Sequence, residues 1–436
     1  MNFFDKYFGI SKSGSTLYTE VVAGITTFFA MSYILFANPA ILAETGMEKS
    51  ALFTATALAA IFGCLVMGIY ARLPFALAPG MGLNAFFAYT VCLALGHTWQ
   101  FALAAVFVEG IIFFLLSVFN LRHLIIRLIP KNLQLAFCPG IGLFIAFIGL
   151  QHAGLIEIHE KTMITFGNIT NPDVLLACLG ILILGILYVK KVQGGMLFGV
   201  LLLTAIGLPF GITKINMLFS LPPSISGTVL KFDFSEILSY DFISITILLL
   251  SVDIFDTMGT FVGVSNTADG MLDKSGDMKN SKKAFIADSL ATVFGAAVGT
   301  STTTTYVESS AGISCGGRTG VTSIATAFCF AIAIFAFPLL SAVPKSAIAV
   351  MLIFAGYSMV MSKPLKSIDF DEYSESVPAF ITIIMIPFTF SIVEGISFGI
   401  LSYVLINTFS GNFRKMNIGI YILAIFFIMR YAVFKL

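Results

Sequence analysis

Two aspartates inside one apolar stretch are the residues best suited to chemistry. Asp253 and Asp256 stand three residues apart in "LLLSVDIFDTMGTFVGVSNTADG", so a helix carries both on one face. A carboxylate at the centre of a bilayer costs roughly 2.5–3.5 kcal/mol even on a lenient scale. Two carboxylates within one turn also repel, so we expect at least one to be held protonated. Such a group suits proton coupling, although a purely structural role for either aspartate stays open.

A third carboxylate, Glu308, lies in a polar stretch between apolar segments. "GTSTTTTYVESSAG", from Gly299 to Gly312, contains a run of six hydroxyl residues ahead of it. The threonines favour extended backbone, and a short helix can begin near Val307. Glu308 would then lie on the first turn of a half-helix.

A second apolar stretch is interrupted in a similar way. "LPFALAPGMGLNAFFAYTV" is interrupted by Pro74, Pro79, Gly80 and Gly82, and a regular helix resumes only near Leu83. Irregular backbone survives at membrane depth only where it is buried in protein or lines a cavity, because unpaired N–H and C=O groups are costly in lipid. Each broken segment therefore marks a candidate cavity.

Composition places the whole chain in a membrane. Of 436 residues, 58% are hydrophobic and 11% are charged, and the mean hydropathy is +0.98. Soluble domains carry about 25% charged residues. The net charge of +1 gives no reason to expect a nucleic-acid partner. The six cysteines show no metal-binding spacing, and we expect no cofactor or metal.

The apolar segments predict fourteen spans and an integral protein of the cytoplasmic membrane. With a cytoplasmic N-terminus, alternation puts 17 of the 22 Lys and Arg in the connections inside and five outside, as the positive-inside rule requires. An apolar tail, 417–434, is either a fifteenth span or an interfacial helix, and 121–130 is expected to be an amphipathic interfacial helix. The spans are expected at about 18–37, 51–70, 74–94, 99–119, 133–152, 173–189, 195–211, 240–264, 283–299, 301–316, 320–341, 344–361, 376–391 and 394–410.

The two broken segments occupy matching places in two halves of the chain. Each is the third span of seven, and the offset from Asn84 to Glu308, 308 − 84 = 224, carries the first span onto 242–261, within the eighth. An odd number of spans per half turns the second half upside down. Paired broken helices in inverted repeats indicate a transporter's substrate site, with coincidence as the open alternative.

Four other acids in or near the spans have weaker claims to function. We expect Glu20 and Glu394 to be solvated at span ends. For Glu109 and Asp288 we favour hydrogen bonding between helices, and a role in gating or coupling stays open.

The predicted site combines carboxylates, an amide, hydroxyls and free backbone, with apolar Phe and Met nearby and no Arg or Lys. An anionic substrate would want cationic partners as well as helix N-termini. A flat, neutral, polar ring suits these groups better, since its edge can pair with backbone and carboxylates.

Four segments carry a family resemblance over nearly the whole chain: "GITTFFAMSYILFANPAIL", "APGMGLNAFFAYTV", "DIFDTMGTFVGVSNTADGM" and "GTSTTTTYVESSAGI". They resemble AzgA-like purine permeases of the nucleobase/ascorbate transporter group, which includes the uracil permease. The resemblance implies an all-α membrane fold with a 7+7 inverted repeat, in which short antiparallel strands break spans 3 and 10. It also implies a core domain at 1–120 and 236–341 and a gate domain at 121–235 and 342–436.

The resemblance further implies proton-coupled import of adenine, guanine or hypoxanthine by alternating access. Asp256 and Glu308 match the base-binding acids, and Met81 and Val307 fall where strand backbone meets the base. Asn84 and Asp253 match polar positions of the purine branch. Where the uracil branch has a histidine, this chain has Thr260, which leaves the proton pathway to Asp253, Asp256 and Glu308.

Three other functions remain as alternatives. An anion exchanger of the same general fold is the nearest, followed by a passive channel and a membrane-embedded enzyme. The sequence does not determine which purine is preferred, or whether the chain forms a homodimer.

Overall fold

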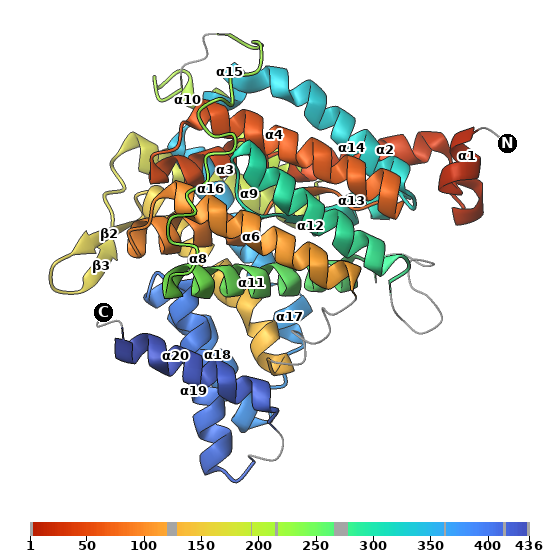
Figure 1. Ribbon diagram of the computed structural model, residues 1–436. Helices are drawn as coiled ribbons and strands as arrows, with labels where there is room; N and C mark the ends of the chain where they lie inside the picture. Colours follow the sequence, from red (N-terminus) through yellow and green to blue (C-terminus); the bar gives the residue numbers. More distant parts are fainter. Residues whose placement is uncertain are drawn as a thin grey trace.

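A computed structural model describes residues 3–119, 129–192, 194–213, 217–265, 278–361, 363–412 and 416–433. The interfacial helix expected at 121–130 lies almost wholly outside these residues. The described chain is mostly helical, with two short strand pairs (Figure 1). Its helices are α1 (Phe3–Phe8), α2 (Leu17–Met31), α3 (Ile34–Leu42), α4 (Lys49–Val66), α5 (Met81–Ala85), α6 (Trp99–Val118), α8 (Lys131–His152), α9 (Pro172–Val189), α10 (Gly195–Gly207), α11 (Tyr240–Ser265), α12 (Ser281–Val298), α13 (Ser309–Ser314), α14 (Gly320–Ala333), α15 (Phe337–Ser341), α16 (Lys345–Val360), α17 (Lys363–Lys366), α18 (Tyr373–Phe388), α19 (Ile392–Phe409) and α20 (Ile418–Val433).

Seven helical stretches are long and apolar enough to cross a membrane by length and composition. Shorter apolar helices include α10, α16 and α18. Each of the fourteen expected spans contains helical residues in the structure, and the count of fourteen crossings remains a prediction. The long stretches are Leu17–Thr45, Lys49–Ala71, Trp99–Val118, Lys131–His152, Pro172–Val189, Gly320–Ser341 and Ile392–Phe409.

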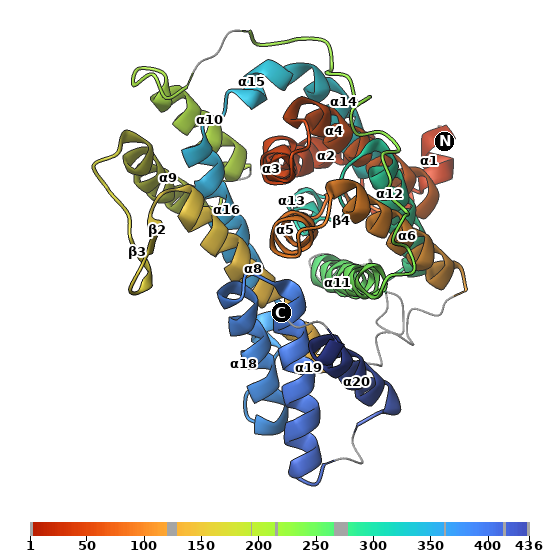
Figure 2. The ribbon, with the colours of Figure 1, turned by 60° about the vertical axis from the view of Figure 1, so that its left-hand side comes forward.

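The helices fall into two sets, which Figure 2 shows side by side. In the first set, α12 packs on α4 and α6, α14 packs on α2 and α4, and α11 packs on α6. In the second set, α16 and α18 both pack on α8, and α9 packs on α10 and α16. Glycines permit close crossings: a Cβ on Gly356 of α16 would press into the carbonyl oxygen of Gly142 on α8.

Two three-residue strands form an antiparallel pair inside the first set of helices. β1 (Leu77–Pro79) pairs antiparallel with β4 (Thr303–Thr305), with Ala78 opposite Thr304. The pairing extends at both ends, where the Gly80 N–H donates to the Thr302 carbonyl at 3.0 Å and the Tyr306 N–H donates to the Ala76 carbonyl at 3.0 Å. Each strand thus supplies the backbone partners that the other lacks, and a short helix, α5 or α13, follows each one.

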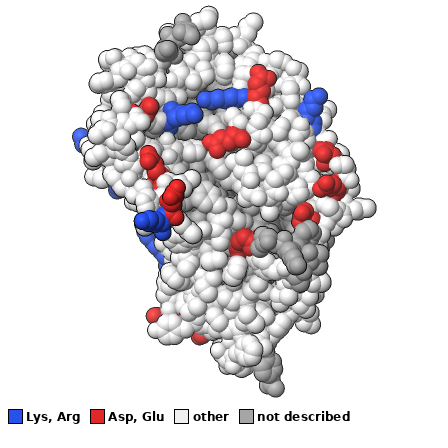
Figure 3. Space-filling model, turned by 90° about the vertical axis from the view of Figure 1, so that its left-hand side faces the viewer, with Lys and Arg blue, Asp and Glu red and all other residues white. Residues whose placement is uncertain are grey.

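A second hairpin, β2 (Ile156–His159) with β3 (Met163–Phe166), projects from one end of the molecule. Figure 3 views the molecule from that end. Basic and acidic side chains are interspersed there among uncharged ones, and neither sign dominates the visible face.

Candidate substrate-binding site

Glu308 stands at the junction between β4 and α13, as the N-cap residue of that helix. The hydroxyl of Tyr33, which lies between α2 and α3 and is only 2% exposed, donates to Glu308 Oε1 at 2.8 Å. One carboxylate oxygen is therefore held by the protein. The sequence alone does not indicate Tyr33, because nothing local links it to a residue 275 positions away.

Asp256 of α11 approaches the same place from the other side. It lies close enough to Glu308 to interact electrostatically, and Tyr306 lies near both carboxyl groups. The Tyr306 hydroxyl donates to the Pro79 carbonyl at 2.5 Å, which ties this ring to β1. Asp256 and Glu308 thus lie near each other beside the paired strands β1 and β4.

Met81 and Val307 each stand two residues after the end of a strand, β1 and β4 respectively. The Val307 side chain is 53% exposed, and its backbone N–H has no hydrogen-bond acceptor among the described residues. Met81 begins α5 and is buried at 7% exposure. Of these two residues, only Val307 is exposed.

Asn84 is fully enclosed by protein rather than exposed at the site. Its Oδ1 accepts a hydrogen bond from the Ser301 hydroxyl, and its Nδ2 has no partner within the described chain. The structure therefore joins α5 to the residues just before β4 through this amide.

Asp253 is also fully buried, and its carboxyl group lies within hydrogen-bonding reach of the Glu109 carboxyl on α6. Tyr33 contacts Glu308 directly, whereas Asp253 does not. The two acids three residues apart therefore have different surroundings: Asp256 faces Glu308, and Asp253 faces Glu109.

Asp288 of α12 holds three elements together. It accepts hydrogen bonds from the hydroxyls of Thr257 on α11, at 2.7 Å, and Thr305 on β4, at 2.9 Å. The Thr292 hydroxyl adds a bond to the Thr303 carbonyl at 2.9 Å. The expected hydrogen bonding between helices is confirmed for Asp288, which fixes β4 relative to α11.

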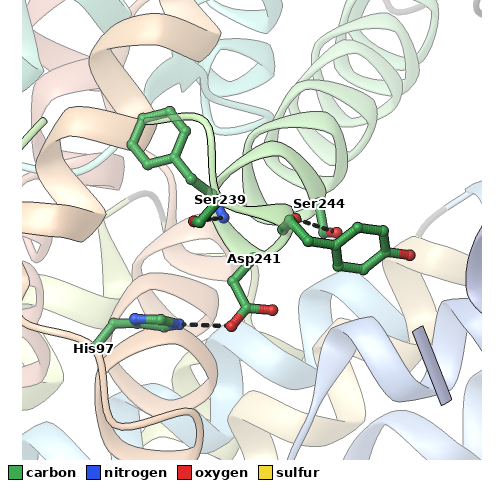
Figure 4. Close-up of polar contacts among 6 residues, drawn as sticks. His97, Ser239, Asp241 and Ser244 are labelled. Carbon is green, nitrogen blue, oxygen red and sulfur yellow. Dashed lines mark hydrogen bonds and ion pairs between the residues drawn. The ribbon is translucent and has the colours of Figure 1, made fainter. Parts of the chain in front are cut away.

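The start of α11 is joined to the loop before α6, as Figure 4 shows. His97 Nε2 lies 3.6 Å from Asp241 Oδ2, and the His97 ring stacks on Phe101 with centroids 4.1 Å apart. Phe101 in turn packs edge-on against Phe242. These contacts hold the N-terminal ends of α6 and α11 together.

The expectation that Glu20 is solvated was wrong. Glu20 is fully buried and accepts hydrogen bonds from the backbone N–H groups of Arg318 at 3.0 Å and Thr319 at 3.1 Å, and from the Thr322 hydroxyl at 2.6 Å. It satisfies free donors at the start of α14, where a negative charge is also favoured by the helix dipole. These three hydrogen bonds offset the free-energy cost of burying the Glu20 carboxylate.

Comparison with known proteins identifies the family and the fold of the chain. A family model described as Permease family, the xanthine/uracil permease model, matches residues 18–398. The fold resembles the transmembrane domain of the cyanobacterial bicarbonate transporter BicA, with a TM-score of 0.65 and 16% identity, covering 90% of this chain and 98% of that one. It also resembles SLC26A9, with a TM-score of 0.67 and 13% identity, over 90% of this chain and 65% of that one.

Relatives match nearly end to end. A Methanocaldococcus jannaschii protein named only as a permease, MJ0326, is 44% identical over 99% of both chains. The adenine permease AdeP of Escherichia coli is 40% identical, covering 98% of this chain and 95% of its own. The guanine/hypoxanthine permease PbuG of Bacillus subtilis is also 40% identical, covering 98% and 99%. The chain therefore belongs to the xanthine/uracil permease family, resembles relatives that are named as purine permeases, and is a membrane transporter and not an enzyme.

Proposed function

We propose that the protein imports adenine, guanine or hypoxanthine across the cytoplasmic membrane together with protons, by alternating access. The observation that carries the proposal is the meeting of Asp256 and Glu308 beside the paired strands β1 and β4. Relatives named as adenine and as guanine/hypoxanthine permeases, both 40% identical, support a purine nucleobase as the substrate class.

The base would bind edge-on between the two carboxyl groups. Tyr33 occupies one oxygen of Glu308, which leaves the other to accept a ring N–H. The unpaired N–H of Val307 can donate to a ring nitrogen or carbonyl, and Met81 lies after the opposite strand. The rings of Tyr33 and Tyr306, with centroids 6.5 Å apart, supply aromatic surface beside the acids.

Alternating access would move the first set of helices, as a core domain, against the second set, as a gate domain. The core is rigid because the hydrogen bonds of Asp288 lock β4 to α11 and α12. Contacts between the sets are fewer, such as those of α3 with α16 and of α5 with α8. In this proposal the N-terminus lies in the cytoplasm and protons enter with the base.

An anion exchanger of the same general fold is the alternative, and the solved structures that share the fold include a bicarbonate transporter. The site chemistry favours the base. In the described chain, the side chains that interact with Glu308 and Asp256 are tyrosines and other acids, and no Lys or Arg is among them: Tyr33, Tyr188, Tyr306, Asp253 and Asp288. Two carboxylates without a cation would repel an anion.

Uptake of labelled adenine, guanine and hypoxanthine in cells that lack their own purine carriers tests the proposal. We expect saturable uptake that an added protonophore abolishes and that does not need sodium. Uptake that ignored the protonophore but collapsed without sodium would overturn proton coupling. Transport of bicarbonate or sulfate but of no purine would favour the exchanger.

A further inference from the structure

A second pair of acids, Glu109 of α6 and Asp253 of α11, lies apart from the base-binding pair. Both side chains are fully buried, and their carboxyl groups are within hydrogen-bonding reach of each other. Among the described residues, neither oxygen of Asp253 has a conventional hydrogen-bond donor, and Oε1 of Glu109 has none either. The hydroxyl of Thr302 approaches Oε2 of Glu109 only at 3.5 Å.

The other buried acids of the same helix set are satisfied as carboxylates. Glu20 accepts three hydrogen bonds, and Asp288 accepts two from threonine hydroxyls. Such bonds stabilise the charged form of an acid. Asp253 has no such donor within the described chain, and Glu109 has only the long contact with Thr302. The charged forms of these two acids are therefore less stabilised than that of Glu20.

Two carboxylates that lie within hydrogen-bonding reach of each other, with a single long donor contact from Thr302, cannot both stay ionised away from water. A proton placed between them removes one charge and supplies the missing donor, as an O–H···O⁻ bond of the strong, charge-assisted kind. A divalent ion is a poorer explanation, because the described residues contain no group of three His, Cys, Asp or Glu arranged to hold a metal.

We propose that Glu109 and Asp253 share one proton, and that this proton is the one transported with the base. The inference rests on the proposed symport and adds Glu109 as a coupling residue that does not contact the substrate. No bond other than O–H is made or broken: the pair gains a proton on one side of the membrane and releases it on the other.

Electrostatics connects this pair to the binding site. Asp253 lies one turn from Asp256 and interacts with its charge, and Asp288 on α12 acts on both Asp253 and Glu109. A proton added to the pair lowers the negative charge near Asp256, which favours the ionised, base-accepting form of that acid. Loss of the proton has the opposite effect, so base and proton are held or released together.

The test uses purified full-length protein in proteoliposomes, with the base that the wild type takes up fastest. Two readouts are compared: external alkalinisation when base is added, and exchange of labelled for unlabelled base, which needs no net proton movement. Glu109→Gln retains a hydrogen-bonding partner for Asp253 but cannot lose or gain the proton. We expect it to lose alkalinisation and accumulation against a gradient while it still exchanges base.

Asp253→Asn should lose alkalinisation in the same way, because either substitution removes half of the shared site, and the double variant should lose no more coupling than each single one. Glu20→Gln is the matched control, since it alters an equally buried acid that has its own donors. We expect it to lower the amount of folded protein but to keep the ratio of protons to base.

Base-induced alkalinisation that persists in either Glu109→Gln or Asp253→Asn would overturn the shared-proton site while leaving symport intact. Loss of exchange together with alkalinisation, in correctly inserted Glu109→Gln, would also overturn it, because Glu109 would then act on binding or on the fold. Absence of alkalinisation in the wild type would instead refute the proposed symport itself. If Glu109→Gln does not insert, the Asp253→Asn variant decides between these outcomes by the same two readouts.

Discussion

Replacing Glu308 with Gln is the most direct test of the proposed hydrogen bond between this residue and the base. The Tyr33 hydroxyl donates to Oε1 at 2.8 Å, and the carbonyl oxygen of Gln can still accept this bond. The amide NH₂ group must then take the place of the second oxygen, which we expect to face the ligand. The shape of the site is kept, but an acceptor of a ring N–H becomes a donor.

The expected loss of affinity follows from these contacts. A hydrogen bond to a charged group contributes about 1.5–3 kcal/mol, and a neutral one about 1 kcal/mol. Two donors that face each other add a further cost, since each loses its acceptor in a buried site. The sum is at least about 1.4 kcal/mol, so the Kd for the base should rise about tenfold or more.

Equilibrium binding of labelled base to purified, detergent-solubilised protein measures this effect without a contribution from membrane insertion or a proton gradient. Tyr33→Phe should weaken binding less, because the carboxylate remains, and the two changes together should be less than additive if Tyr33 acts only through Glu308. Glu394→Gln is the matched control, because Glu394 also accepts a tyrosine hydroxyl, from Tyr431 in the second set of helices. An unchanged Kd in well-folded Glu308→Gln would show that the ligand binds elsewhere.

Three further predictions concern motion, packing and selectivity. Phe29 of α2 stacks on Phe198 of α10 with ring centroids 5.9 Å apart. Cross-linked cysteines at these two positions, in a chain without other reactive cysteines, should therefore stop transport until a reductant is added. Full transport while cross-linked would refute movement of the two sets of helices. Gly356→Ala should destabilise the fold by about 1–3 kcal/mol, seen as a lower melting temperature. Gly185→Ala should not, because its new Cβ would lie 3.8 Å from Phe354. Equal melting temperatures of the two variants would refute the packing argument. Asn84→Ser, which alters the contact with Ser301, should change the ratio of adenine to hypoxanthine uptake more than their sum, and an unchanged ratio would remove Asn84 from selectivity.

The family and the membrane class follow from local features of the sequence. Apolar length and scarce charge require a membrane, and the relatives confirm the resemblance to purine permeases. The acids Asp256 and Glu308 stand out by chemistry alone, because a carboxylate in a span is costly and needs a reason. The family and the two candidate site acids were therefore accessible without coordinates.

The partners of these acids were not accessible in the same way. Asp253 and Asp256 look equivalent in sequence, one turn apart on α11, yet one faces Glu109 and the other faces Glu308. Glu20 was misread because its donors, around Arg318 and Thr322, lie about 300 residues away. The sequence alone identified the acidic residues whose burial in a membrane costs so much free energy that each must have a structural or functional role. Only the tertiary structure decided which of them receive hydrogen bonds from donors and which lie beside another acid, because hydrogen-bond partners are set by how distant helices pack.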